Sequence, residues 1–595
     1  MNPKKLKVLS LVLASLLFIS CDKPEKPAEK KIELPKPASM LTLVPDDTIF
    51  FAGGLEPVPL KEWTQWSITH FNLSKEMFNP QEIQKLREEA KTDGQRLALQ
   101  IWEDYLATLL ALDTQFASWG FAEKPQLASY AIGLAPVLLR INLQDVQRFN
   151  TKIAELEEKA KVKAKVETLG TATFRRYALN EQEPLAHLII GVDGNDAVFM
   201  IDVGIESQQT LALALGQSKP EKSLAQGNRL KSLQENYKLL ASSLVYLDHQ
   251  QILTGLTTKD GNRMAKMVQQ LASKLKEENK GWLNELHSEG CRKDLQTMGA
   301  NWPQTVFGYT AFDVKAKPSK VDALMVVESK DKPLLEGLKS LRGFVPYYSK
   351  EAVFAPAVFS FGLGLSVENV GPFLMKQWTE ITQKQYSCSF LKEMQTDLQA
   401  KNPAAVGFAT SMASGVRGLS LSLLSLSLEK KEGMATPMPK ELEAVVSLSA
   451  KDPAALVQTV AAMVPQLATL QIPADGTPVQ LPLPMPLPFT PMAAINGSHL
   501  TVYAGAKAEQ LAKEMGKMSL ESSQGFLASS LDYGKYYGLI GDVVASVDKK
   551  EGQQQATPQM LSMFEAMKQA KVRVQTKLDF TERGLEMTMD MTSPE

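Results

Sequence analysis

Ser242, Asp248 and His249 place a hydroxyl, a carboxylate and an imidazole within one short stretch of the chain. These are the three side-chain types of a serine hydrolase, in which the imidazole takes the hydroxyl proton and the carboxylate orients the imidazole. A triad is defined by its geometry, and nearness in sequence does not produce that geometry. The three residues are therefore the candidate catalytic residues of one alternative, an envelope hydrolase.

An internal repeat argues against catalysis at this stretch. The string LASSL of residues 240–244, which contains Ser242, recurs at residues 527–531, where Asp532 follows but no histidine does. A feature present in both copies is explained by shared structure. The pattern favours a protein without catalytic activity and leaves the hydrolase as an alternative.

No other group of residues predicts a metal site or a cofactor. The histidines are scattered, and none belongs to an HExxH or HxH motif. The glycines do not form a GxxxxGK or GxGxxG phosphate-binding pattern. A formal net charge of −1 supplies no basic field for nucleic acid. We therefore expect no metal, no cofactor and no nucleic-acid partner.

The N-terminus carries an export pattern. Three lysines within residues 4–7 precede an apolar stretch at residues 8–19, and a small residue then precedes Cys21. The apolar stretch is shorter than the about 20 residues that a membrane-spanning helix needs. The pattern resembles the signal peptide of bacterial lipoproteins. This resemblance implies cleavage after residues 1–20 and attachment of fatty acids such as palmitate to Cys21.

The segment after Cys21 has the composition of a linker. Residues 22–39 combine prolines with nearly balanced charges, and an extended proline-rich segment of this length reaches roughly 50 Å. The resemblance therefore implies a tether, residues 21–39, that holds an exported protein on the periplasmic side of a membrane. Asp22 resembles the inner-membrane retention signal of enteric bacteria. Because Lys23 follows it, the choice between inner and outer membrane stays open.

Cys291 and Cys388 remain once Cys21 is assigned to lipid. An exported protein matures in a compartment where disulfides persist. We therefore predict a disulfide between Cys291 and Cys388, with two separately buried thiols as the alternative.

The folded part of the chain repeats an order of motifs. A strand pattern, a helix that begins at aspartate, and a hairpin follow one another in residues 137–202 and again in residues 444–504. The hairpins are predicted at residues 187–202 and 492–504, with DGN and NG turns. We interpret the chain as a tandem duplication, with repeats at residues 40–335 and 336–595.

The fold class predicted for each repeat is α+β. The order strand, helix, strand, strand, helix, strand over residues 137–247 and 443–533 fits an antiparallel sheet of ferredoxin-like order. The first repeat also contains a helical insert at residues 81–118, where Leu97, Ile101 and Tyr105 fall at helical spacing.

These patterns lead to one main functional hypothesis. We expect a membrane-anchored lipoprotein with a non-catalytic binding or scaffold role and an envelope protein as partner. A carrier or sensor of an amphiphilic ligand, bound in a cleft between the repeats, is an alternative. It would require a contiguous apolar cavity of several hundred Å³.

Overall fold

The computed structural model divides the chain into two compact units. It describes residues 40–71, 80–110, 115–181, 186–203, 207–274, 276, 281–346, 357–429, 438–463, 471–481, 488–546 and 558–593. Unit 1 takes the described residues of Met1–Thr69, Leu73–Glu328 and Ser387–Ser389, and unit 2 those of His70–Asn72, Ser329–Tyr386 and Phe390–Glu595. The predicted signal peptide, Cys21 and the tether lie outside the described residues.

The sheet of unit 1 is antiparallel, with the order β4-β5-β6-β7-β3-β2-β1-β8-β9-β10. Its strands are β1 (Phe50–Gly53), β2 (Leu127–Ala131), β3 (Val137–Asn142), β4 (Lys165–Leu169), β5 (Ala172–Ala178), β6 (His187–Asp193), β7 (Asp196–Asp202), β8 (Leu244–Asp248), β9 (Gln304–Asp313) and β10 (Ser319–Glu328).

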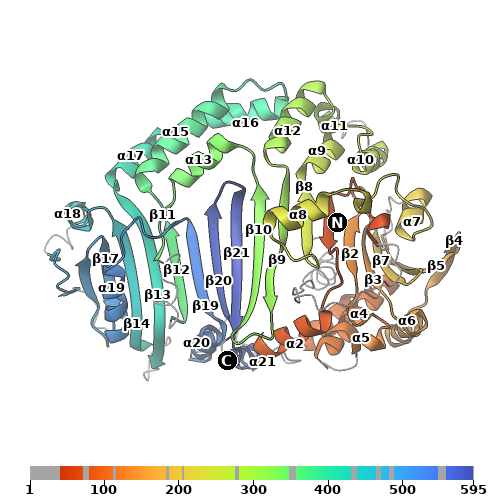
Figure 1. The fold of residues 1–595 in the computed structure, drawn as a ribbon, viewed down its shortest axis with the longest axis horizontal. Helices are drawn as coiled ribbons and strands as arrows, with labels where there is room; N and C mark the ends of the chain where they lie inside the picture. Colours follow the sequence, from red (N-terminus) through yellow and green to blue (C-terminus); the bar gives the residue numbers. More distant parts are fainter. Residues whose placement is uncertain are drawn as a thin grey trace, which may run out of the picture. The chain divides into compact units, whose positions relative to one another are not determined.

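Helices cover both faces of the central strands of unit 1 (Figure 1). Because side chains alternate along a strand, Leu138 joins a core cluster with Tyr130, whereas Leu139 joins a second cluster with Phe149. The helices are α2 (Leu60–Phe71), α3 (Pro80–Glu89), α4 (Asp93–Leu110), α5 (Gln115–Ser118), α6 (Val146–Ala160), α7 (Gln208–Ala214), α8 (Arg229–Tyr237), α9 (His249–Thr257), α10 (Arg263–Ser273), α11 (Gly281–Leu286) and α12 (Glu289–Asn301).

The sheet of unit 2 is also antiparallel, with the order β15-β16-β17-β14-β13-β12-β19-β20-β21. Its strands are β12 (Phe359–Gly364), β13 (Val416–Glu429), β14 (Met438–Ala450), β15 (Val479–Gln480), β16 (Met492–Asn496), β17 (His499–Ala504), β19 (Leu527–Asp532), β20 (Arg573–Phe580) and β21 (Gly584–Ser593). A separate pair joins β11 (Gly343–Phe344) to β18 (Gln524–Gly525).

The helices of unit 2 include three that follow one another between β12 and β13 (Figure 1). Its core cluster joins Leu511 to Val445 and Phe344, which places α19 on one face of the sheet. The helices are α13 (Lys332–Ser340), α15 (Val367–Gln383), α16 (Ser389–Gln399), α17 (Ala404–Met412), α18 (Pro453–Met463), α19 (Ala506–Gly516), α20 (Tyr533–Ser546) and α21 (Pro558–Lys568).

The two predicted hairpins are confirmed in their residues and turns. The hairpin of β6 and β7 turns at Gly194, and that of β16 and β17 turns at Gly497. Both glycines have φ of +57°, a left-handed conformation that glycine adopts without a steric penalty. Asp145 caps α6 by accepting a hydrogen bond from the Arg148 amide at 2.8 Å.

The pairing of strands differs from the predicted ferredoxin-like order. In that arrangement β3 would have β8 as a neighbour, but β3 pairs with β2 and β7, and β8 pairs with β1 and β9. The prediction began at residue 137 and so missed β1 and β2, which insert between β3 and β8. The segment predicted as an insert holds α3, α4 and α5, and the corresponding connection of unit 2 is helical as well.

Candidate functional site

Asp248, the predicted triad carboxylate, caps a helix. Its Oδ1 accepts a hydrogen bond from the Gln251 amide at 2.8 Å, at the start of α9. Its Oδ2 accepts from the Arg229 guanidinium at 2.5 Å. The carboxylate therefore holds the end of β8 against α8 and α9, and it does not orient the neighbouring imidazole.

His249 has structural partners at both ring nitrogens. Nδ1 lies 2.8 Å from the carbonyl oxygen of Trp302, and Nε2 lies 3.1 Å from the hydroxyl of Thr305. Ser242 is 0% exposed, so its hydroxyl is not accessible to a substrate. The three residues therefore do not present a nucleophile and a general base at the surface.

The repeated LASSL strings do not occupy equivalent positions. Residues 240–244 lead into β8, whereas residues 527–531 form β19 itself. Asp248 and Asp532 are the equivalent residues, because each ends its strand and accepts a hydrogen bond from the amide three residues later. The serines of the two strings are therefore displaced along the strand, and the similarity between the strings does not reflect shared structure.

The Cys291–Cys388 disulfide is present, which confirms the prediction. Both cysteines are completely buried. The carboxylate of Asp294 accepts hydrogen bonds from the amides of Ser387 and Cys388, at 2.6 and 3.1 Å. Glu285 lies beside both sulfur atoms, which makes a group of metal-ligand type within the described residues. Because both sulfurs are bonded to each other, this group offers no thiolate.

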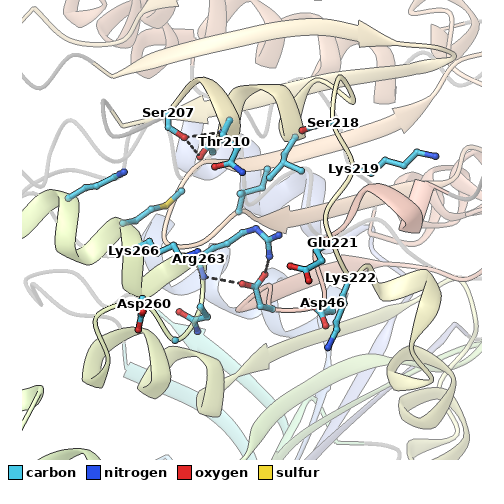
Figure 2. A pocket seen from close by; sticks show the side chains of 18 residues that line it. Asp46, Ser207, Thr210, Ser218, Lys219, Glu221, Lys222, Asp260, Arg263 and Lys266 are labelled. Carbon is cyan, nitrogen blue, oxygen red and sulfur yellow. Dashed lines mark hydrogen bonds and ion pairs between the residues drawn. The ribbon is translucent and has the colours of Figure 1, made fainter.

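A polar pocket of about 710 Å³ lies in unit 1 (Figure 2). Arg263 reaches its centre from the first turn of α10 and forms an ion pair with Asp47, which also accepts the Arg263 amide at 3.0 Å. Lysines and acidic side chains surround this pair in similar numbers. They are Lys219, Lys222 and Lys266, and Asp46, Glu221 and Asp260.

The pocket offers polar and charged groups for contact with a ligand. Ser207 lines it, but its hydroxyl caps α7 by accepting from the Thr210 amide at 3.1 Å. No histidine or cysteine is among the lining residues. Its mixed charges and polar lining do not match the apolar cavity that an acyl chain needs.

Arg140 is the largest fully buried side chain of the described residues, with 0% exposure. Its guanidinium donates to the Tyr130 hydroxyl at 3.1 Å, to Asp193 at 2.8 Å and to the Ala214 carbonyl at 2.7 Å. Burial raises the pKa of the nearby Asp196 carboxyl, and the positive charge of Arg140 opposes that rise. Every bond joins elements of the unit 1 core, so Arg140 is a structural residue.

The sheet of unit 2 exposes an apolar face. On β13, Ser420 and Ser422 are buried, at 5% and 1% exposure, while the alternating Leu419 is 48% exposed. On β14, Val446 is 42% exposed and lies on the same face, because it pairs with Leu421 of β13. Leu419 belongs to a row of leucines that crosses four strands in register. The row is Leu363, Leu419, Leu448 and Leu500.

In unit 1 the equivalent face is closed by helices. Leu139 lies six residues before the helix-capping Asp145, as Val446 lies six residues before Asp452, which makes the same contact at 2.9 Å. Leu139 is 7% exposed and belongs to a cluster with Ile101 of α4 and other side chains of α6. The same strand position is therefore buried under helices in unit 1 and partly exposed in unit 2.

The sequence of β13 contains a signal for this face. Residues 419–428 read LSLSLLSLSL, an alternation that indicates a strand with one buried and one exposed face. The alternation alone would assign the leucines to the core. The pairing of Arg263 with Asp47 has no signal in the sequence, because the two residues are 216 positions apart and only the fold brings them together.

Comparisons with known proteins identify no relative. No family model, no curated protein and no solved structure matches the chain. Among the helices of the described residues, none combines the length and apolar character that crossing a membrane requires.

Proposed function

We propose that this protein is a lipid-anchored lipoprotein of the bacterial envelope with a non-catalytic binding or scaffold role. The observation that carries the proposal is the exposed apolar face of the unit 2 sheet around Leu419 and Val446. Exposed apolar patches on a folded protein mark sites of interaction with proteins or membranes. The structural contacts of Asp248 and His249 support a role without catalysis.

The two units are proposed to be a tandem duplication. In unit 1 the first strand, β1, lies between β2 and β8, and in unit 2 the first strand, β12, lies between β13 and β19. The equivalent orders are β5-β6-β7-β3-β2-β1-β8-β9-β10 and β15-β16-β17-β14-β13-β12-β19-β20-β21. Nine strands in one order support a common origin better than the short sequence matches do. An experimental structure with a different strand order in either unit would refute the duplication.

Anchoring rests on the N-terminal pattern that ends at Cys21. Cells that express the full chain should incorporate labelled palmitate into it, and the protein should sediment with membranes. A Cys21→Ser variant should lose the label and leave the membrane fraction. Labelling that persists in this variant would contradict lipidation at Cys21.

The binding role is tested by photocrosslinking the native, lipidated protein. A benzophenone-bearing residue is placed at position 419 of unit 2, and as a control at position 166 of unit 1, where Val166 is 62% exposed. A discrete protein product at position 419, absent at position 166 and lost in a Val446→Glu background, is the expected result. Equal products at both positions, or none, would overturn the binding role.

The same face favours the carrier alternative over the hydrolase. Acyl chains can also cover apolar side chains such as Leu419, although this surface is a sheet face rather than an enclosed cavity. Lipid as the sole product at position 419 would replace the scaffold role by a carrier role. The proposed partner would otherwise be an envelope protein.

A further inference from the structure

The helix α17 of unit 2 presents an apolar surface of its own. It contains no charged residue and no buried residue. Ala405, Phe408, Ala409 and Met412 follow the spacing of a single helix stripe, and all four are exposed. Phe408 is 72% exposed and Met412 is 47% exposed.

The opposite side of α17 is fixed against α15. A Cβ atom added to Gly371 of α15 would lie only 2.8 Å from the Gly407 Cα, so the two helix backbones approach each other closely. The spacing of Gly407 and Phe408 along the helix directs the Phe408 stripe away from this contact. The stripe is therefore held outward by the packing of α17 on α15.

The stripe and the sheet face are complementary in chemistry. The residues of α17 carry no charge, and Leu419 and Val446 are exposed hydrophobic side chains of the sheet. Unit 1 shows that this sheet face accepts helices, because α4 and α6 bury the position of Leu139. In unit 2, the contact of Phe359 with Tyr536 brings α20 against this face, at 6.4 Å between ring centroids. A second helix would continue that interface.

We propose that the protein associates with a second copy of itself, with α17 of each copy lying on the unit 2 sheet face of the other. Because one chain carries both the exposed helix and the sheet face that would bind it, two copies can form two identical contacts around a two-fold axis. If α17 covered the sheet of its own chain, its contact with α15 through Gly407 would have to break. A second copy can bind α17 without any change in that contact. The inference rests on the proposed binding role of this face and names its partner.

The first test measures mass. The full-length chain in mild detergent should sediment as a dimer, and Phe408→Glu and Leu419→Glu should each raise the dimer dissociation constant at least about tenfold. Val166→Glu, at an exposed position of unit 1, is the matched control and should leave the constant unchanged. Circular dichroism melting shows whether each variant is folded. A folded monomer at every concentration, or a dimer unaffected by both variants, would overturn the proposal.

The second test asks which chain supplies the helix. A Phe408→Cys chain mixed with a Leu419→Cys chain should form a crosslinked heterodimer on mild oxidation. A chain with both substitutions that crosslinks only within itself would show that α17 closes on its own sheet, which contradicts the proposal. A different protein captured at position 419, from a chain that stays monomeric, would retain the binding role and overturn self-association.

Discussion

Arg140→Met should destabilise unit 1 by about 3 to 5 kcal/mol, the range found when one partner of a buried ion pair is removed. The structure supports the size of this effect. Arg140 has no solvent exposure and donates to Tyr130, Asp193 and Ala214. Methionine replaces the aliphatic part of the arginine side chain but not its guanidinium, so the loss combines these bonds with a small cavity. The Ala214 carbonyl alone, left without its donor, accounts for about 1 to 3 kcal/mol.

The loss of stability in Arg140→Met should depend on pH, because Arg140 lies near the carboxyl of Asp196. Burial raises the pKa of Asp196, and without Arg140 that pKa should rise further. A carboxyl whose folded pKa exceeds its unfolded value contributes stability at low pH that is lost as the pH rises through the folded pKa. The variant should therefore lose more stability at pH 7 than at pH 4.

The assay is urea unfolding of the full chain, monitored by tryptophan fluorescence. A variant that destabilises unit 2 shifts only the unit 2 transition, so the transition that does not shift belongs to unit 1. Arg140→Lys is the matched control, since it keeps one positive charge but not the three-way donor geometry, and it should cost less. A loss below about 1 kcal/mol, or a loss equal at pH 4 and pH 7, would refute the reasoning.

Three further predictions follow from single contacts. Replacing Cys291 and Cys388 by serine should lower the free energy of unfolding by up to about 4.7 kcal/mol, the chain-entropy value for a separation of 97 residues. Wild-type protein unfolded in reductant should show the same loss. An unchanged urea midpoint would contradict the prediction. Burial lowers the pKa of His499 below its usual 6.5, so unit 2 should keep full stability above pH 6.5 and lose it as the pH falls through the lowered pKa. His499→Gln should remove that slope in a pH series of urea midpoints, and a slope that persists would assign it to other groups. Gly216→Ala should cost about 1 to 3 kcal/mol, because Gly216 has φ of +71° and an added Cβ would lie 1.8 Å from Asp193; an unchanged melting temperature would show that this region relaxes freely.

Local features of the fold could be predicted from the sequence. The hairpin turns, the aspartate cap of α6 and the helical spacing of Leu97, Ile101 and Tyr105 all depend on residues close together in the chain. The Cys291–Cys388 disulfide was predictable for a different reason, because assigning Cys21 to lipid left one pair. In each case the residue types and their spacing allowed few alternative local structures or cysteine pairings.

The order of strands and the positions of the candidate sites could not be predicted in this way. The insertion of β1 and β2 between β3 and β8 depends on pairings between distant residues, such as Phe51 with Tyr246. The polar pocket likewise depends on Arg263 meeting Asp47 from the other end of unit 1. Sequence spacing does not reveal such contacts, so only the fold showed that Asp248 and His249 have structural partners and that Ser242 is buried.

The sequence by itself determined that β13 begins as a strand with one apolar and one small polar face, because leucine and serine alternate from Leu419 to Leu423. Only the tertiary structure decided which face is covered. Ser420 and Ser422 are buried, with Ser360 donating to Ser422 at 3.0 Å, whereas Leu419 and Leu421 on the other face are 48% and 38% exposed. An alternating pattern specifies two faces but not which of them a helix will cover, since that depends on where the connections between distant strands run.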